Sequence, residues 1–150
     1  TKFIDRSDEL NESIKLIEKI INKNNGNLLK FEEWFEQKEN SHTNIFLVGN
    51  SISAPDFSLF DILDFLNEFV NHYNFSNNYK EDIYEYLNFP KLSRFYKEFK
   101  NLPKMQKYFN SLLYELPYQN KSALFSSKNK KKIWDPSTDV DKFPDKILIS

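Results

Sequence analysis

The 150-residue sequence contains no cysteine and only two glycines. The lack of cysteine excludes disulfides, thiolate metal sites and cysteine nucleophiles, and it allows the cytoplasmic location that we expect. So few glycines argue against a glycine-rich loop that cradles phosphate groups. The net charge of −1 gives no overall field to attract nucleic acid or an anionic membrane. No apolar run approaches the roughly 20 residues of a membrane-spanning helix. We therefore expect no nucleic-acid partner and no membrane partner.

What the sequence does contain is apolar residues at helical spacing along most of its length. This spacing and the positions of polar clusters predict a first helix that is capped by Ser7 and ends in the cluster 22–26. They also predict helices over residues 28–37, 54–72 and 80–87, and two more that begin at Pro90 and Pro103. The last of these has its apolar positions at Met105, Tyr108, Phe109 and Leu112. No segment alternates apolar and polar residues as a strand would. The sequence predicts an all-α helical bundle.

Residues 46–65 predict a loop followed by a strongly specified helix. Ser53 and Asp56 have the spacing of a capping box, in which each side chain binds the backbone N–H of the other residue. Pro55 lies in the first turn, where its missing N–H costs nothing. The helix that follows is apolar around most of its circumference. This pattern is typical of a helix at the centre of a core.

Two motifs connect the chain to a known family. The first is Phe-Leu-Val-Gly-Asn at residues 46–50, followed by the capping box and the core helix. The second is Phe-Pro-x-Leu-x-x-Phe-x-x-x-Phe-x-x-Leu-Pro-x-Met-x-x-Tyr over residues 89–108. Together they resemble the all-helical C-terminal domain of the glutathione transferases. The run Phe-Asp-Ile-Leu-Asp at residues 60–64 is most similar to the mu and sigma classes. The resemblance implies a helical domain over residues 1–125 and leaves a charged C-terminal tail over residues 126–150.

The resemblance implies a division of labour between two domains. In that family a thioredoxin-like N-terminal domain binds most of the glutathione and stabilises its thiolate, which is the nucleophile. The helical domain supplies the wall of the electrophile pocket and part of a homodimer interface. Nothing in this sequence is typical of a thioredoxin-like βαβ unit, so we expect a fragment or a free-standing helical module. Glutathione would be the co-substrate of the full-length protein, and the chain alone is expected to be inactive.

The resemblance also implies where an electrophile would bind. Alignment with the mu class places Tyr118, Gln119 and Asn120 on the segment that lines the acceptor pocket. Phe125 falls where that class has a tryptophan. Tyr114, just before this segment, is a candidate proton donor or stacking group. Because Gln119 replaces an apolar aromatic residue, the pocket is expected to be more polar. The other interpretation is that these side chains pack together or face solvent.

The chain shows no self-sufficient catalytic constellation. Asp61 and Asp64 on the predicted core helix invite a general acid–base interpretation. The resemblance implies instead that acidic residues there bind local backbone and basic groups. His42 and His72 lie far apart in sequence and lack the spacing of metal ligands. We therefore assign no catalytic residue and no metal site.

A non-catalytic role is the alternative. Helical modules of the same kind are appended to aminoacyl-tRNA synthetases and translation elongation factors, where they bind other proteins. Such modules keep the capping box and core helix, because folding requires them, while the pocket changes. The polar Gln119, the missing domain and the lysines of residues 128–132 favour this interaction module. The mu-like segment over residues 111–125 favours the enzyme.

Overall fold

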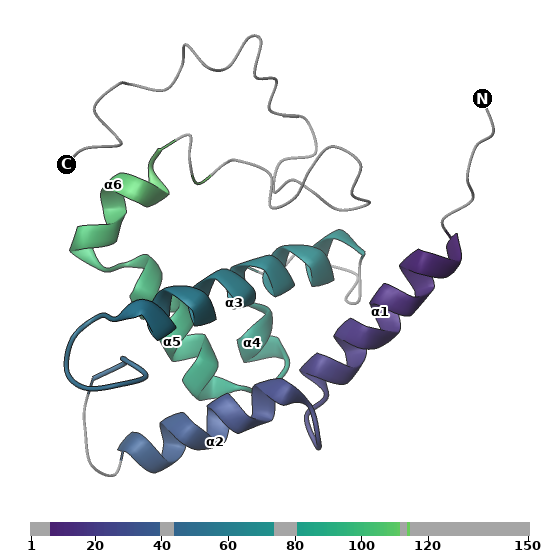
Figure 1. Ribbon diagram of the computed structural model, residues 1–150, viewed down its shortest axis with the longest axis horizontal. Coiled ribbons are helices and arrows are strands. Elements are labelled where there is room, and N and C mark those ends of the chain that lie inside the picture. Colours follow the sequence, from purple (N-terminus) through teal and green to yellow (C-terminus); the bar gives the residue numbers. More distant parts are fainter. Residues whose placement is uncertain (1–6, 40–43, 74–80, 112–113, 115–150) are drawn as a thin grey trace, which may run out of the picture. The chain divides into compact units, whose positions relative to one another are not determined.

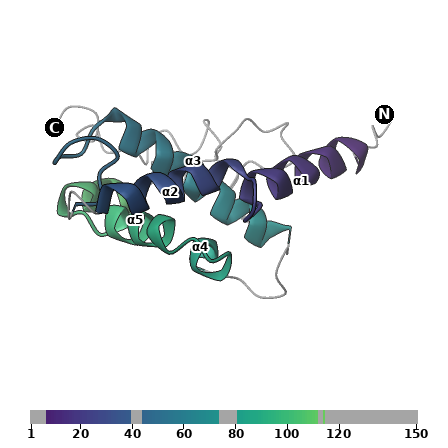
Figure 2. The ribbon, with the colours of Figure 1, turned by 90° about the horizontal axis from the view of Figure 1, so that it is seen from below.

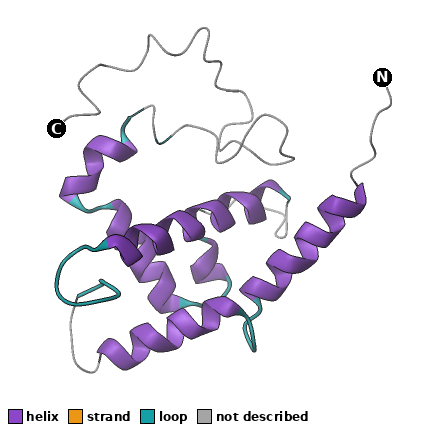
Figure 3. Ribbon diagram, viewed as in Figure 1, coloured by secondary structure: helices purple, strands orange, loops and turns teal. Residues whose placement is uncertain are grey.

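The computed structural model describes residues 7–39, 44–73, 81–111 and 114 (Figure 1). Its elements are α1 (Ser7–Ile21), α2 (Asn27–Glu39), α3 (Ala54–His72), α4 (Ile83–Tyr86), α5 (Pro90–Lys100), the 3-10 turn η1 (Pro103–Met105) and α6 (Gln106–Phe109). Figure 3 shows helices and loops, and no strand, over these ranges. The all-α prediction is confirmed. The chain divides into two compact units, residues 1–99 and 100–150.

The core of the first unit is built around α5, which contacts both α2 and α3. On one side, the rings of Phe35 on α2 and Phe95 on α5 have centroids 5.4 Å apart. On the other, Phe60 on α3 stacks on Tyr96 at 5.5 Å and on Phe99 at 4.5 Å. Stacked aromatic pairs of this kind contribute beyond the area that they bury. Three helices thus share one aromatic core.

The helix α1 is joined to α2 by a tight turn at Gly26. The Gly26 N–H donates to the carbonyl of Asn22 at 2.9 Å. A Cβ at this position would lie 2.4–2.7 Å from backbone atoms of Ile20 and Asn22. Only glycine fits so close an approach. Beyond the turn α1 contacts α2 and extends away from the other helices of the unit (Figure 2).

The central helix α3 differs from its prediction. A circumference that is apolar for the most part predicts burial on most sides, but the described residues of the helix are buried mainly on one side. Leu59, Leu63 and Leu66 face the core, whereas Phe57 and Ile62 are 45% and 52% exposed. The reason is that α4 and α5 supply partners for one face of α3. Among the described helices, none combines the length and the hydropathy required to cross a bilayer.

Candidate functional site

The buried carboxylate of Asp56 organises the start of α3. Ser53 and Asp56 form the capping box, with Ser53 in an extended conformation. Asp56 Oδ2 accepts the Ser53 N–H and the Ser53 hydroxyl, each at 2.8 Å. Its Oδ1 accepts the Leu47 N–H at 2.7 Å. Asp56 is 0% exposed. Three donors therefore fix this carboxylate, which ties the preceding loop to the helix.

The helix α2 holds the same loop from its other side. The Lys38 ammonium donates to Asn44 Oδ1 at 3.1 Å and to the Phe46 carbonyl. The indole N–H of Trp34 donates to the Leu47 carbonyl at 3.2 Å. These side chains donate hydrogen bonds to backbone carbonyls that in a loop would otherwise bind water. Their role in the described structure is to position the loop.

The two aspartates with a suggested acid–base role are not brought together. Asp64 is buried and accepts the Tyr96 hydroxyl at 2.8 Å, whereas Asp61 is exposed. The neighbouring Tyr84 donates its hydroxyl to a main-chain carbonyl of α3. Burial raises the pKa of Tyr84 well above its ordinary value, and the nearby charges of Asp64 and Asp82 raise it further. Tyr84 thus stays protonated and holds α4 to α3.

A carboxylate that the sequence does not reveal caps α5. Glu32 on α2 is buried and accepts the N–H groups of Lys91 and Leu92 at 2.8 and 2.9 Å. Burial raises the pKa of Glu32, although the two N–H groups act to lower it. Glu32 lies almost sixty positions from α5 in the sequence. Local spacing therefore gives no signal for this contact.

The short helix α4 is held by polar side chains at its first turn. Asp82 accepts the Tyr84 N–H at 2.9 Å and also the Ser93 hydroxyl from α5. Asn67 on α3 accepts the Ile83 N–H through its Oδ1 at 3.0 Å. The Asn67 Nδ2 is buried with no hydrogen-bond partner. A four-residue helix makes few bonds of its own, so these side chains fix its position.

A shallow concavity lies between α2, α5 and the loop that precedes α3. Its lining consists of Phe35, Lys38, Asn44, Ile45, Lys91, Arg94 and Phe95. Lys38 is engaged by the loop oxygens, and the Arg94 Nε pairs with the Glu98 carboxylate at 2.8 Å. Lys38 and Arg94 are thus bound by groups of the protein itself. Among the described residues, no group of three or more potential metal ligands comes together.

Of the predicted acceptor residues, Tyr114 is described, while Tyr118, Gln119, Asn120 and Phe125 lie outside the described residues. The Tyr114 ring contacts two rings of α6. Its centroid is 5.6 Å from that of Tyr108 and 4.9 Å from that of Phe109. His42 and the predicted boundary between residues 125 and 126 also lie outside.

The described part is thus an all-helical domain around a capped central helix. Residues 5–112 match the family described as glutathione S-transferase, C-terminal domain. The chain belongs to this family. Neither a curated protein nor a solved structure matches the chain. Because the family match ends at residue 112, it covers the helical core and not the segment from Tyr114 to Phe125.

Proposed function

We propose that this chain is the electrophile-side domain of a glutathione transferase-like protein. Joined to a thioredoxin-like domain, it would support conjugation of glutathione to hydrophobic electrophiles or carry hydrophobic ligands. The observation that carries the proposal is the family match over residues 5–112. The mu-like class and the acceptor residues beyond Tyr114 belong to the proposal. So do a homodimer and a cytoplasmic location.

The polar contacts of the first unit support this division of labour. The carboxylate oxygens of Asp56, Glu32 and Asp82 accept hydrogen bonds from backbone N–H groups and hydroxyls. These bonds join helices and loops to one another. Activation of a nucleophile requires instead a base or an oriented donor beside a reactive group. The proposal therefore assigns stabilisation of the glutathione thiolate to the thioredoxin-like domain. It assigns apolar contacts with the electrophile to the helical domain.

Calorimetric titration with glutathione tests the proposal. The 150-residue chain and the full-length gene product are titrated in parallel under the same conditions. We expect binding by the full-length protein and none by the chain alone, because the thioredoxin-like domain would hold most of the glutathione. Absence of binding to both proteins would contradict the transferase proposal and favour the interaction module.

One surface feature favours the interaction module as a second candidate. Phe31 and Trp34 lie three residues apart on α2, and both side chains are exposed. The bond from the Trp34 indole N–H to the loop fixes its ring. Rigid, exposed aromatic side chains are common among the residues that dominate protein–protein binding. A pull-down with a Trp34→Ala variant as the comparison tests this candidate. If the parent chain and Trp34→Ala recover the same translation-associated proteins, this surface no longer supports the interaction module.

A further inference from the structure

The turn between α1 and α2 contains the one Asn-Gly pair of the sequence. Asn25 precedes Gly26, whereas the other glycine, Gly49, follows a valine. The backbone nitrogen of the next residue can attack the side-chain amide of an asparagine, and a next residue without a Cβ hinders that attack least. The pair also lies in a turn, where no helix fixes the chain. Steric hindrance of this reaction is therefore lowest at Asn25.

The Asn25 side chain is exposed, and no described residue makes a hydrogen bond with its amide. Asn50 differs in both respects that matter. It is also exposed, but its side-chain oxygen accepts a bond from the Asn44 amide at 2.9 Å, and it is followed by Ser51, which has a Cβ. Reaction at Asn25 therefore requires no side-chain hydrogen bond to break, whereas reaction at Asn50 does.

One backbone hydrogen bond opposes the reaction. The Gly26 N–H donates to the Asn22 carbonyl at 2.9 Å, and this nitrogen must lose its proton in order to attack. The net strength of one such bond slows the attack by about fivefold. Gly26 is buried, but residues 22–25, which form the rest of the turn, are exposed, so the bond opens with these residues already in water. The bond therefore delays the reaction without preventing it.

We propose that Asn25 is a site of spontaneous deamidation that yields isoaspartate. The Gly26 nitrogen attacks the Asn25 Cγ and forms a C–N bond, and the side-chain nitrogen leaves as ammonia together with the Gly26 proton. Water then opens the resulting succinimide. When water breaks the bond between the main-chain carbonyl carbon of Asn25 and the Gly26 nitrogen, the chain runs through Cγ and the main-chain carboxylate is released. Water is the co-reactant, and the inference is independent of the proposed function.

The turn has no room for the isoaspartyl product. Isoaspartate adds one carbon to the backbone, which lengthens the chain by about 1.5 Å. Even a Cβ on Gly26 would lie 2.4–2.7 Å from backbone atoms of Ile20 and Asn22. The turn must therefore change shape, and with it the alignment of α1 on α2. Because α1 has 15 residues, a length at which an isolated helix is marginally stable, we expect the modification to loosen it.

Ageing of the 150-residue chain in mildly alkaline buffer tests the site. Isoaspartate is measured by methyl transfer from S-adenosylmethionine with an isoaspartate-specific carboxyl methyltransferase, and peptide mapping by mass spectrometry locates it. We expect it to form about tenfold faster at Asn25 than at Asn24, which is exposed in the same turn but precedes a residue with a Cβ. Asn25→Gln is expected to abolish the signal at this position. Equal rates at Asn24 and Asn25, or no isoaspartate at Asn25, would overturn the proposal.

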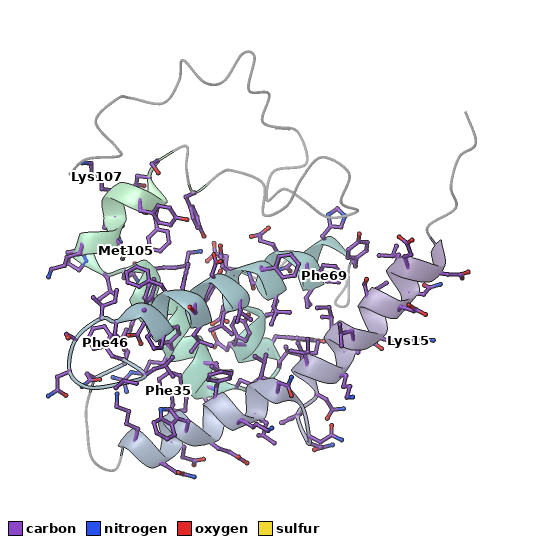
Figure 4. All side chains as sticks on the ribbon, in the orientation of Figure 1. Lys15, Phe35, Phe46, Phe69, Met105 and Lys107 are labelled. Atoms are coloured by element: carbon purple, nitrogen blue, oxygen red, sulfur yellow. The ribbon has the colours of Figure 1, made fainter. Side chains whose placement is uncertain are left out.

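Limited digestion with trypsin tests the effect on α1. Figure 4 shows Lys15 on the side of α1 that points away from the other helices of the unit, and Lys15 and Lys19 are both exposed. Trypsin cleaves after lysines of a helix when the helix opens locally, so we expect cleavage about tenfold faster in the isoaspartyl form. Freshly purified Asn25→Asp has the new charge on an ordinary backbone and should keep the parent rate. Equal acceleration in Asn25→Asp, or none in the isoaspartyl form, would contradict an effect of the added carbon.

Discussion

The two units use their side chains in different ways. In the first, the carboxylates of Glu32, Asp56 and Asp82 are buried, and each collects donors from other segments. In residues 100–114 the aromatic rings are exposed or half-buried and are held by near neighbours in sequence. Burial of a polar group requires a full set of partners, so it leaves little freedom to bind a ligand. The difference indicates that the buried carboxylates of the first unit maintain its fold.

Truncation of one aromatic ring in each unit tests this difference with the largest expected effect. Phe99→Ala removes a fully buried ring that stacks on Phe60 at 4.5 Å. We expect it to lower the free energy of unfolding by about 4 kcal/mol. Tyr108→Ala is expected to change it by less than about 0.5 kcal/mol. Urea denaturation followed by circular dichroism measures both, and equal losses would contradict the assignment of stability to the first unit.

The cap of α3 gives the next largest effect. Asp56→Ala leaves the N–H groups of Leu47 and Ser53 without their acceptor in a buried site. We expect a loss of about 3 kcal/mol. The matched control is Asp61→Ala, which removes an exposed aspartate from the same helix and is expected to cost less than about 0.5 kcal/mol. An unchanged denaturation midpoint for Asp56→Ala would rule out a stabilising cap.

Substitution of each glycine by alanine distinguishes a steric cost to stability from a conformational one. Gly26→Ala places a Cβ against the backbone of Ile20 and Asn22, and we expect a loss of about 2 kcal/mol. Gly49 has φ +66° and open space around it. Gly49→Ala is therefore expected to cost about 1 kcal/mol, the penalty of the left-handed conformation alone. Thermal unfolding of the two variants gives the comparison, and a larger loss at Gly49 would contradict it.

The smallest effect that we expect is a dependence of the free energy of unfolding on pH, and it comes from Glu32. Its pKa is raised above the ordinary 4.5, so the folded state holds this proton more tightly than the unfolded state. The resulting stabilisation is present below the unfolded pKa and is lost as pH rises through the folded pKa. Relative to Glu32→Gln, the parent chain should gain stability as pH falls from neutral to about 4. The opposite trend in denaturation midpoints would mean that the bonds to Lys91 and Leu92 outweigh burial.

The features that could be predicted from the sequence are local ones. Helical spacing within each segment was enough to place α1, α2, α3 and α5, because periodicity needs no distant partner. The spacing of Ser53 and Asp56 likewise indicates their pairing. The contact of Glu32 with α5 and that of Asn67 with Ile83 join segments far apart in sequence. No local pattern encodes such contacts.

Apolar spacing also could not show which aromatic residues stay exposed. The spacing places Tyr108 with Met105 and Phe109 on one helix, but the structure has a 3-10 turn followed by a four-residue helix. Tyr108 is 41% exposed there, whereas Met105 and Phe109 are half-buried. The family resemblance, and not the apolar spacing, made Tyr114 a candidate site residue. Its ring partners are known from the structure alone.

We propose above that the helical domain supplies apolar contacts to the electrophile side of a transferase. Calorimetric comparison of glutathione with S-hexylglutathione on the full-length protein tests it most directly. We expect S-hexylglutathione to bind about tenfold more tightly or better, because the hexyl chain is removed from water against the helical domain. Equal affinities for the two ligands would contradict the claim.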